Sequence, residues 1–179
     1  MTTLLLLLSL AADPIDARVF IEINEARLAE SIPAVAHSLI LEDTAAVMAD
    51  WLGYANRRNK TFVFHNVNTA WALKEYPDLK WDRLRATFPD GLPDQLSAHS
   101  VARLCGWEGG LVYDIEGEAR RCNAFDLVYG WAHSDETSPP TNHWMVLLNF
   151  IANFNVCGVA SEPRGGGRQI VVAVFGEVK

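Results

Sequence analysis

Two valine-rich runs at the end of the chain constrain the fold most. Residues 156–160 and 169–175 are rich in β-branched and apolar side chains, and the glycine-rich segment 163–168 separates them. Such runs favour strands, and a short glycine-rich segment between two of them favours a turn. The sequence therefore predicts a β-hairpin that closes the chain.

Helical patterns come before this hairpin. In residues 19–30 and 39–55 the apolar side chains recur every three or four positions, which places them on one face of a helix. Ser38 precedes the second of these runs, and serine is a preferred residue at helix N-termini. We expect two amphipathic helices here.

Two shorter helices are predicted near the end of the chain. Asn123 is suited to cap the first of them, and residues 143–148 form the second. In the first we expect the inner face to consist of Phe125, Val128, Tyr129 and Ala132.

The order of these elements indicates the fold class. Residues 109–115 have the composition of a strand, so helices come first, then a strand, then helices and the closing hairpin. This order is typical of an α+β domain, in which helices pack over a largely antiparallel sheet. A chain of 179 residues suits one domain, which we expect to span residues 17–179.

The N-terminus has the composition of a secretory signal. Leucines fill most of residues 4–10, and small residues follow them. We interpret residues 1–12 as a signal peptide, although no Lys or Arg precedes the leucines, and a buried first strand or helix is the alternative. The run is too short to span a bilayer, which needs roughly 20 apolar residues. We therefore expect a secreted or cell-envelope protein without a transmembrane segment.

Net charge and cysteine content limit the function further. The net charge of −7 argues against nucleic acid as a partner, since phosphate backbones are bound by clustered Lys and Arg. The three cysteines, Cys105, Cys122 and Cys157, allow at most one intramolecular disulfide.

An ordered set of short motifs resembles the CAP superfamily, which comprises the cysteine-rich secretory, antigen 5 and pathogenesis-related proteins and bacterial SCP-like extracellular relatives. Asn24 and Arg27 match an N-x-x-R pattern near the start of that domain, and His65 follows the second helix as a family histidine does. The bacterial branch has W-x-x-S and then a histidine before an apolar helix, which Trp131, Ser134 and His143 resemble. The resemblance covers residues 19–175 and implies an α–β–α sandwich of the CAP type.

The resemblance also implies a cleft with two histidines and two acidic groups. His65 and His143 match the histidines, but Tyr113 stands where the family has Glu and Asp114 where it has Asn. The loop between Ser134 and His143 is also longer than the family pattern. The expected ligand-binding residues are His65, Tyr113, Asp114, Trp131, Ser134 and His143.

Three functions remain open at this point. The first is a non-catalytic secreted binding module, whose histidine-lined cleft takes a small ligand, a cation or an extracellular partner. The second is a metal-assisted or protease-like hydrolase, with its catalytic groups drawn from His65, Asp114, Glu116, Ser134 and His143. His65 and His143 with a carboxylate could hold a divalent cation such as zinc or calcium. The third is a structural domain with a vestigial cleft, which the altered Glu position favours.

Overall fold

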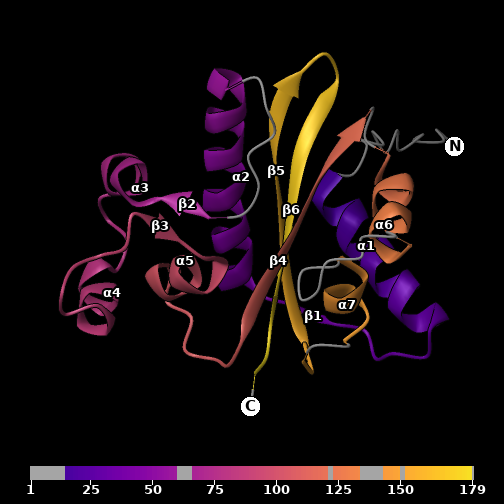
Figure 1. Cartoon of the computed structure of the whole chain (residues 1–179). Coiled ribbons are helices and arrows are strands. Elements are labelled where there is room, and N and C mark those ends of the chain that lie inside the picture. The colour runs from indigo at the N-terminus through magenta and orange to yellow at the C-terminus, as the bar shows by residue number, and fades with distance from the viewer. Residues whose placement is uncertain (1–14, 60–65, 121–122, 134–142, 150–151, 179) are drawn as a thin grey trace, which may run out of the picture.

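The central feature of the fold is a four-stranded sheet with helices on both faces (Figure 1). The structure is a computed structural model, and it describes residues 15–59, 66–120, 123–133, 143–149 and 152–178. The sheet order is β1-β5-β6-β4. Its strands are β1 (Ala36–His37), β4 (Val112–Arg120), β5 (Val156–Gly165) and β6 (Arg168–Gly176).

The closing hairpin is the middle of this sheet. β5 and β6 pair antiparallel, with Cys157 opposite Phe175, and two left-handed glycines, Gly166 and Gly167, make the turn. β4 adds antiparallel on the other side of β6, whereas β1 adds parallel to β5 over two residue pairs. The sheet is therefore largely antiparallel, as the sequence predicts.

The helices divide between the two faces of the sheet. On the left in Figure 1, α2 (Leu39–Asn59) packs on β5 and β6, and α5 (Ala98–Cys105) packs beside it. On the right lie α1 (Ile15–Ala29), α6 (Ala124–Ala132) and α7 (His143–Leu147). A small two-stranded sheet, with α3 (Thr69–Glu75) and α4 (Trp81–Thr87), lies beyond α2, and its strands are β2 (Val67–Asn68) and β3 (Gln95–Leu96).

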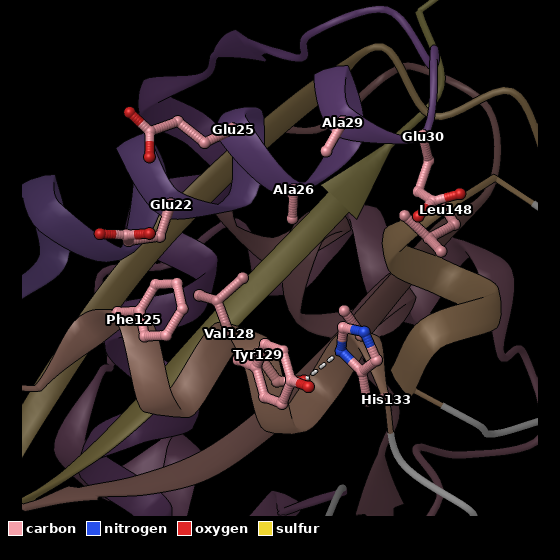
Figure 2. A pocket seen from close by; sticks show the side chains of 11 residues that line it. Glu22, Glu25, Ala26, Ala29, Glu30, Phe125, Val128, Tyr129, His133 and Leu148 are labelled. Atoms are coloured by element: carbon pink, nitrogen blue, oxygen red, sulfur yellow. Dashed lines mark hydrogen bonds between the residues drawn. The ribbon is translucent and has the colours of Figure 1, made fainter.

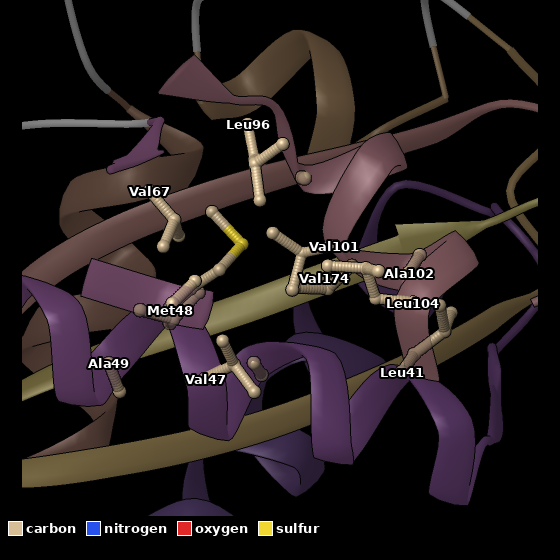
Figure 3. Packing of buried hydrophobic residues seen from close by; sticks show 14 of the residues in the cluster. Leu41, Val47, Met48, Ala49, Val67, Leu96, Val101, Ala102, Leu104 and Val174 are labelled. Atoms are coloured by element: carbon tan, nitrogen blue, oxygen red, sulfur yellow. The ribbon is translucent and has the colours of Figure 1, made fainter. Parts of the chain in front are cut away.

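Each face of the sheet has its own hydrophobic core, because side chains alternate along a strand. Val172 and Val174 of β6 face α2 and α5, and Val171 and Ala173 face α1 and α6. Figure 3 shows the first core, where Met48 of α2 lies among side chains of β2, β3 and α5. The sheet separates the two cores. Successive residues of β4 therefore face different cores: one residue faces α2 and α5, and the next faces α1 and α6.

A buried arginine joins α1 to three other segments. Arg27 is 1% exposed. Its Nε donates to the Pro33 carbonyl at 2.9 Å, and its two Nη atoms donate to the carbonyls of Leu147 and Phe154 at 2.7 and 3.1 Å. Nη1 also donates to Asn149 Oδ1 at 2.9 Å. The guanidinium therefore satisfies the acceptors of segments that have no regular pairing of their own.

Asn24, one turn earlier on α1, completes this clamp. Its side chain accepts a hydrogen bond from the Val35 amide at 2.8 Å and donates to the Val35 carbonyl at 3.2 Å. The N-x-x-R pattern found in the sequence thus fixes the chain between α1 and β1. Its two polar side chains replace main-chain pairing there.

Glycines permit two close approaches in the sheet. An added Cβ at Gly158 would overlap main-chain atoms of Leu41 and Glu42, because the N-terminus of α2 lies directly on β5. An added Cβ at Gly117 would meet the side chains of Leu127 and Trp131. Both helices reach the sheet only because these positions lack a side chain.

Most predicted elements are confirmed. The helix predicted at 19–30 is Ile15–Ala29, and the one predicted at 39–55 extends to Asn59. Ser38 Oγ accepts from the Leu41 amide at 3.4 Å, and Asn123 caps α6. No helix in the described ranges has the length and apolar character needed to cross a membrane. The helix α5 and the β2–β3 pair are additions that the sequence analysis did not include. The predicted signal at residues 1–12 lies outside the described residues.

The predicted inner face of α6 is right for Val128, which is buried, and wrong for Phe125 and Tyr129. Phe125 and Tyr129 are 58% and 54% exposed, and the buried residues are Ala124, Val128 and Trp131. Positions 124, 128 and 131 also follow the helical spacing, so α6 carries two apolar stripes. The stripe that contains Trp131 fits the sheet, because Gly117 leaves room for the indole.

We expect Arg27→Met to lower the free energy of unfolding by about 3 kcal/mol or more, since several acceptors lose a charged donor while the side-chain volume is nearly kept. Urea denaturation followed by circular dichroism measures the change. Arg85→Met is the control, because Arg85 is exposed and forms an i,i+3 ion pair with Asp82 at the surface. This substitution should change the free energy of unfolding by less than about 0.5 kcal/mol. Equal effects of the two substitutions would contradict the role of the clamp.

We expect Gly158→Ala to lower the free energy of unfolding by about 2–3 kcal/mol or more, because main-chain atoms of α2 have to move to admit the methyl group. Gly130→Ala is the matched control: nothing lies within 4 Å of an added Cβ, and the position is helical. This control should be neutral or stabilising by up to about 1 kcal/mol. Thermal unfolding of both variants tests the close approach, and a neutral Gly158→Ala would exclude it.

Candidate functional site

The sequence-predicted site residues fall into three groups in the structure. His65 and Ser134 lie outside the described residues. Tyr113, Asp114 and Glu116 lie on β4, which is an edge strand of the sheet. Trp131 ends the buried stripe of α6, and His143 begins α7.

The carboxylates of β4 lie on the α2 and α5 face of the sheet. Asp114 pairs with Val174 and Glu116 with Val172, and directly paired residues share a face. Both valines belong to the core under α2 and α5. Glu116 is 1% exposed, which makes it one of the few buried acidic side chains in the described part of the chain.

His143 lies on the other face. Its ring contacts that of Trp131, with centroids 6.3 Å apart, and Trp131 packs with Ile115 and Ala119 of β4. The strand registers put the side chains of Asp114 and Glu116 on the opposite face of the sheet from Trp131. At the β4 edge, however, Glu116 and His143 both line one hollow of about 800 Å³, together with Trp131.

The two aromatic residues predicted to line a cleft are largely packed. Trp131 is 3% exposed, and its Nε1 donates to the main-chain carbonyl of Glu116 at 3.1 Å. Tyr113 is half-buried against Phe154, with ring centroids 6.1 Å apart. Trp131 therefore belongs to the core, and Tyr113 packs at the edge of the sheet.

Metal and thiol chemistry find little support among the described residues. No group of three or more His, Cys, Asp or Glu side chains in these ranges is placed to hold a metal ion. Burial raises the pKa of the Cys105 thiol to about 11, and burial also raises the pKa of Cys157, which is fully buried. A thiol with a raised pKa is a poor nucleophile at neutral pH.

A groove with largely apolar walls lies between α1 and α6 (Figure 2). It has a volume of about 370 Å³, within the range of small-ligand sites. The described residues that line it are Glu22, Glu25, Ala26 and Ala29 of α1, Glu30 just after that helix, Phe125, Val128, Tyr129 and Ala132 of α6, and His133 and Leu148.

Aromatic rings form one wall of this groove. Phe125, Tyr129 and His133 are spaced four residues apart, so they lie one above another along α6. The Tyr129 ring stacks on the His133 ring with centroids 4.0 Å apart, and on the Phe125 ring at 5.8 Å. The His133 Nδ1 lies 2.9 Å from the Tyr129 carbonyl, which holds the imidazole in place. The three rings therefore form one stacked wall.

The opposite side of the groove is acidic. Glu22 and Glu25 lie on neighbouring turns of α1, and Glu30 follows the end of that helix; Figure 2 shows Glu30 beside Leu148. The small side chains of Ala26 and Ala29 form the floor between them. Leu148 closes one end, and the Arg27 clamp holds its neighbours Leu147 and Asn149. The clamp thus positions part of the site.

Sequence reasoning missed this groove. The signal was present in α6, where Phe125, Tyr129 and His133 form a stripe separate from the stripe of Ala124, Val128 and Trp131. A helix with two apolar stripes can bury only one against the sheet, so the other faces solvent or a ligand.

Comparison with known proteins adds one structural similarity. No family model matches the chain, and no curated protein sequence matches it. The fold is similar to the solved structure of an outer surface protein from Borrelia burgdorferi, with a TM-score of 0.59 and 18% sequence identity. The match covers 91% of this chain and 92% of that chain. At this identity the similarity concerns the fold alone.

The raised pKa values of Cys105 and Cys157 predict unreactive native thiols. In a Cys122→Ser variant at about pH 8, we expect the native protein to react with Ellman's reagent about a hundredfold more slowly than free cysteine, because so little thiolate is present. The denatured variant should react at the ordinary rate and release two equivalents. Rapid reaction of the native variant would contradict this account.

Proposed function

We propose that this chain is a non-catalytic binding module whose ligand site is the α1–α6 groove. The observation that carries the proposal is the exposed, pre-stacked pair Phe125 and Tyr129 over an apolar floor. Exposed aromatic rings that gather in a concave surface mark interaction sites more often than scattered ones do. The expected ligand is a small molecule with an apolar part.

The residues that line the groove favour ligand binding over catalysis. Its lining contains carboxylates, aromatic rings and one imidazole, but no hydroxyl of Ser or Thr and no thiol among the described residues. The glutamates and His133 come from opposite sides of the groove (Figure 2), and within the described lining no hydrogen bond joins them. A nucleophile with its activating base, which acyl transfer needs, is not assembled among these residues.

The hydrolase alternative keeps less support than the binding module. It requires histidines and carboxylates in one cleft. Glu116 and His143 both line a hollow at the β4 edge, whereas Asp114 is not part of that lining. The other candidates, His65 and Ser134, lie outside the described residues. A zinc or calcium site that uses both histidines stays a prediction, which calorimetric titration of a His65→Ala, His143→Ala variant against the parent protein tests.

Membership of the CAP superfamily is part of the proposal. The Asn24 and Arg27 pair that carries the resemblance anchors α1 here, and the helix–sheet–helix layers agree with the sandwich that the resemblance implies. We further propose a secreted or cell-envelope location. The leucine-rich N-terminus supports it, as does the description of the structural neighbour as an outer surface protein.

Filling the groove should abolish ligand binding without unfolding the protein. We expect the native protein to bind the uncharged dye Nile red saturably, and Ala29→Trp to weaken that binding by about tenfold or more, because the indole occupies the apolar floor. Fluorescence titration measures both affinities.

Ala17→Trp is the matched control, since Ala17 is an exposed alanine on the same helix but lies outside the groove. It should bind the dye as the parent does. Binding that survives Ala29→Trp, or that both variants lose equally, would place the ligand elsewhere and overturn the proposal.

A further inference from the structure

We infer that the α1–α6 groove selects organic cations, namely a trimethylammonium or a protonated amine attached to a small apolar body. The inference rests on the proposed function, because it specifies the ligand of the same site. It follows from what surrounds the apolar floor: carboxylates on one side, aromatic rings on the other, and no Lys or Arg among the described residues of the lining.

The charge of the groove is one-sided. Glu22, Glu25 and Glu30 border it, and none of them forms an ion pair with another described residue. The nearest basic residue in the sequence, Arg27, points away from the groove into its clamp. Three carboxylates at a concave apolar surface concentrate cations there and repel anions. Charge complementarity therefore favours a positively charged occupant over a fatty acid or another acidic amphiphile.

The aromatic wall suits the same occupant. The Phe125 and Tyr129 side chains are more than half exposed. Tyr129 stacks on both Phe125 and His133, so Phe125, at the end of the stack, presents the more open ring face. A quaternary ammonium is attracted to ring faces by the ring quadrupole, with about 0.5–1 kcal/mol for each exposed contact. A neutral group of the same shape makes the same apolar contact but lacks this electrostatic attraction to the ring. The groove thus offers two independent sources of preference for a cation.

The size and floor of the groove limit the rest of the ligand. A volume of about 370 Å³ accommodates a small molecule. The floor and the closed end are lined by the apolar side chains of Ala26, Ala29, Val128, Ala132 and Leu148. The part of the ligand attached to the ammonium should therefore be apolar. A fully polar cation, such as a free polyamine, would leave this surface uncovered.

Three probes with one common frame test the inference. They are benzyl alcohols that carry a para-trimethylammonium, a para-tert-butyl or a para-sulfonate group, so the first two share their shape and differ in charge. We expect the ammonium probe to bind the parent protein about tenfold more tightly than the tert-butyl probe, and the sulfonate probe to bind more weakly than either. Ligand-observed NMR measures the affinities, and the ammonium preference should shrink in about 0.5 M salt because the carboxylates are screened.

Two sets of substitutions distinguish the effect of the charges in the groove from the effect of the net charge of the protein. Glu22→Gln, Glu25→Gln and Glu30→Gln together should weaken ammonium binding by about fivefold or more and leave tert-butyl binding unchanged. Asp78→Asn, Asp90→Asn and Asp94→Asn together change the net charge equally at exposed positions outside the groove, and should alter neither affinity.

The outcomes distinguish this inference from the proposed function. Equal binding of the ammonium and tert-butyl probes, or tighter binding of the sulfonate, overturns the cation inference while the binding module stands. An ammonium preference that the aspartate control also removes overturns it as well, since the effect then comes from overall charge. If no probe binds, the proposed function fails together with the inference.

Discussion

The buried guanidinium of Arg27 is the interaction on which the arrangement of the molecule depends. It reaches three carbonyls and one side-chain amide from segments far apart in the sequence, and so ties the end of α1 to the segments that precede β1 and β5. Removing a charge from water costs free energy, which the hydrogen bonds here offset. The same clamp fixes the residues beside Leu148, so the stability of the fold and the shape of the groove share one cause.

The parity of β4 decides which chemistry the fold can assemble. A strand side chain faces one side of the sheet or the other, and a shift of one residue exchanges the faces. Asp114 and Glu116 share the parity of Val112 and face α5, whereas His143 and Trp131 approach the opposite face. This parity puts the side chains of Glu116 and Trp131 on opposite faces, and Glu116 and His143 share a hollow only at the β4 edge of the sheet. The α1–α6 groove is lined by Phe125 and Tyr129 of α6, which the sheet leaves exposed.

Much of the fold is predictable from local patterns. The periodicity of α1 and α2, the caps Ser38 and Asn123 and the glycine turn of the hairpin each act within a few residues. The helix α5 was also signalled, by Ser97 as its N-cap and Gly106 in the left-handed conformation after its end. The face of α6 was not predictable in this way. Two apolar stripes compete there, and the choice depends on Gly117 of another strand. The groove follows from that choice, since it is lined by the stripe that the sheet leaves uncovered.

The most direct test of the binding site is methyl NMR of the protein during titration with an uncharged aromatic ligand such as 4-tert-butylbenzyl alcohol. The groove contains five methyl-bearing side chains: Ala26, Ala29, Val128, Ala132 and Leu148. This account predicts that the largest chemical-shift changes occur at these methyl groups and saturate together. Changes centred instead on the core under α2 and α5, near Val112 and Val174, or the absence of saturable changes, would contradict it.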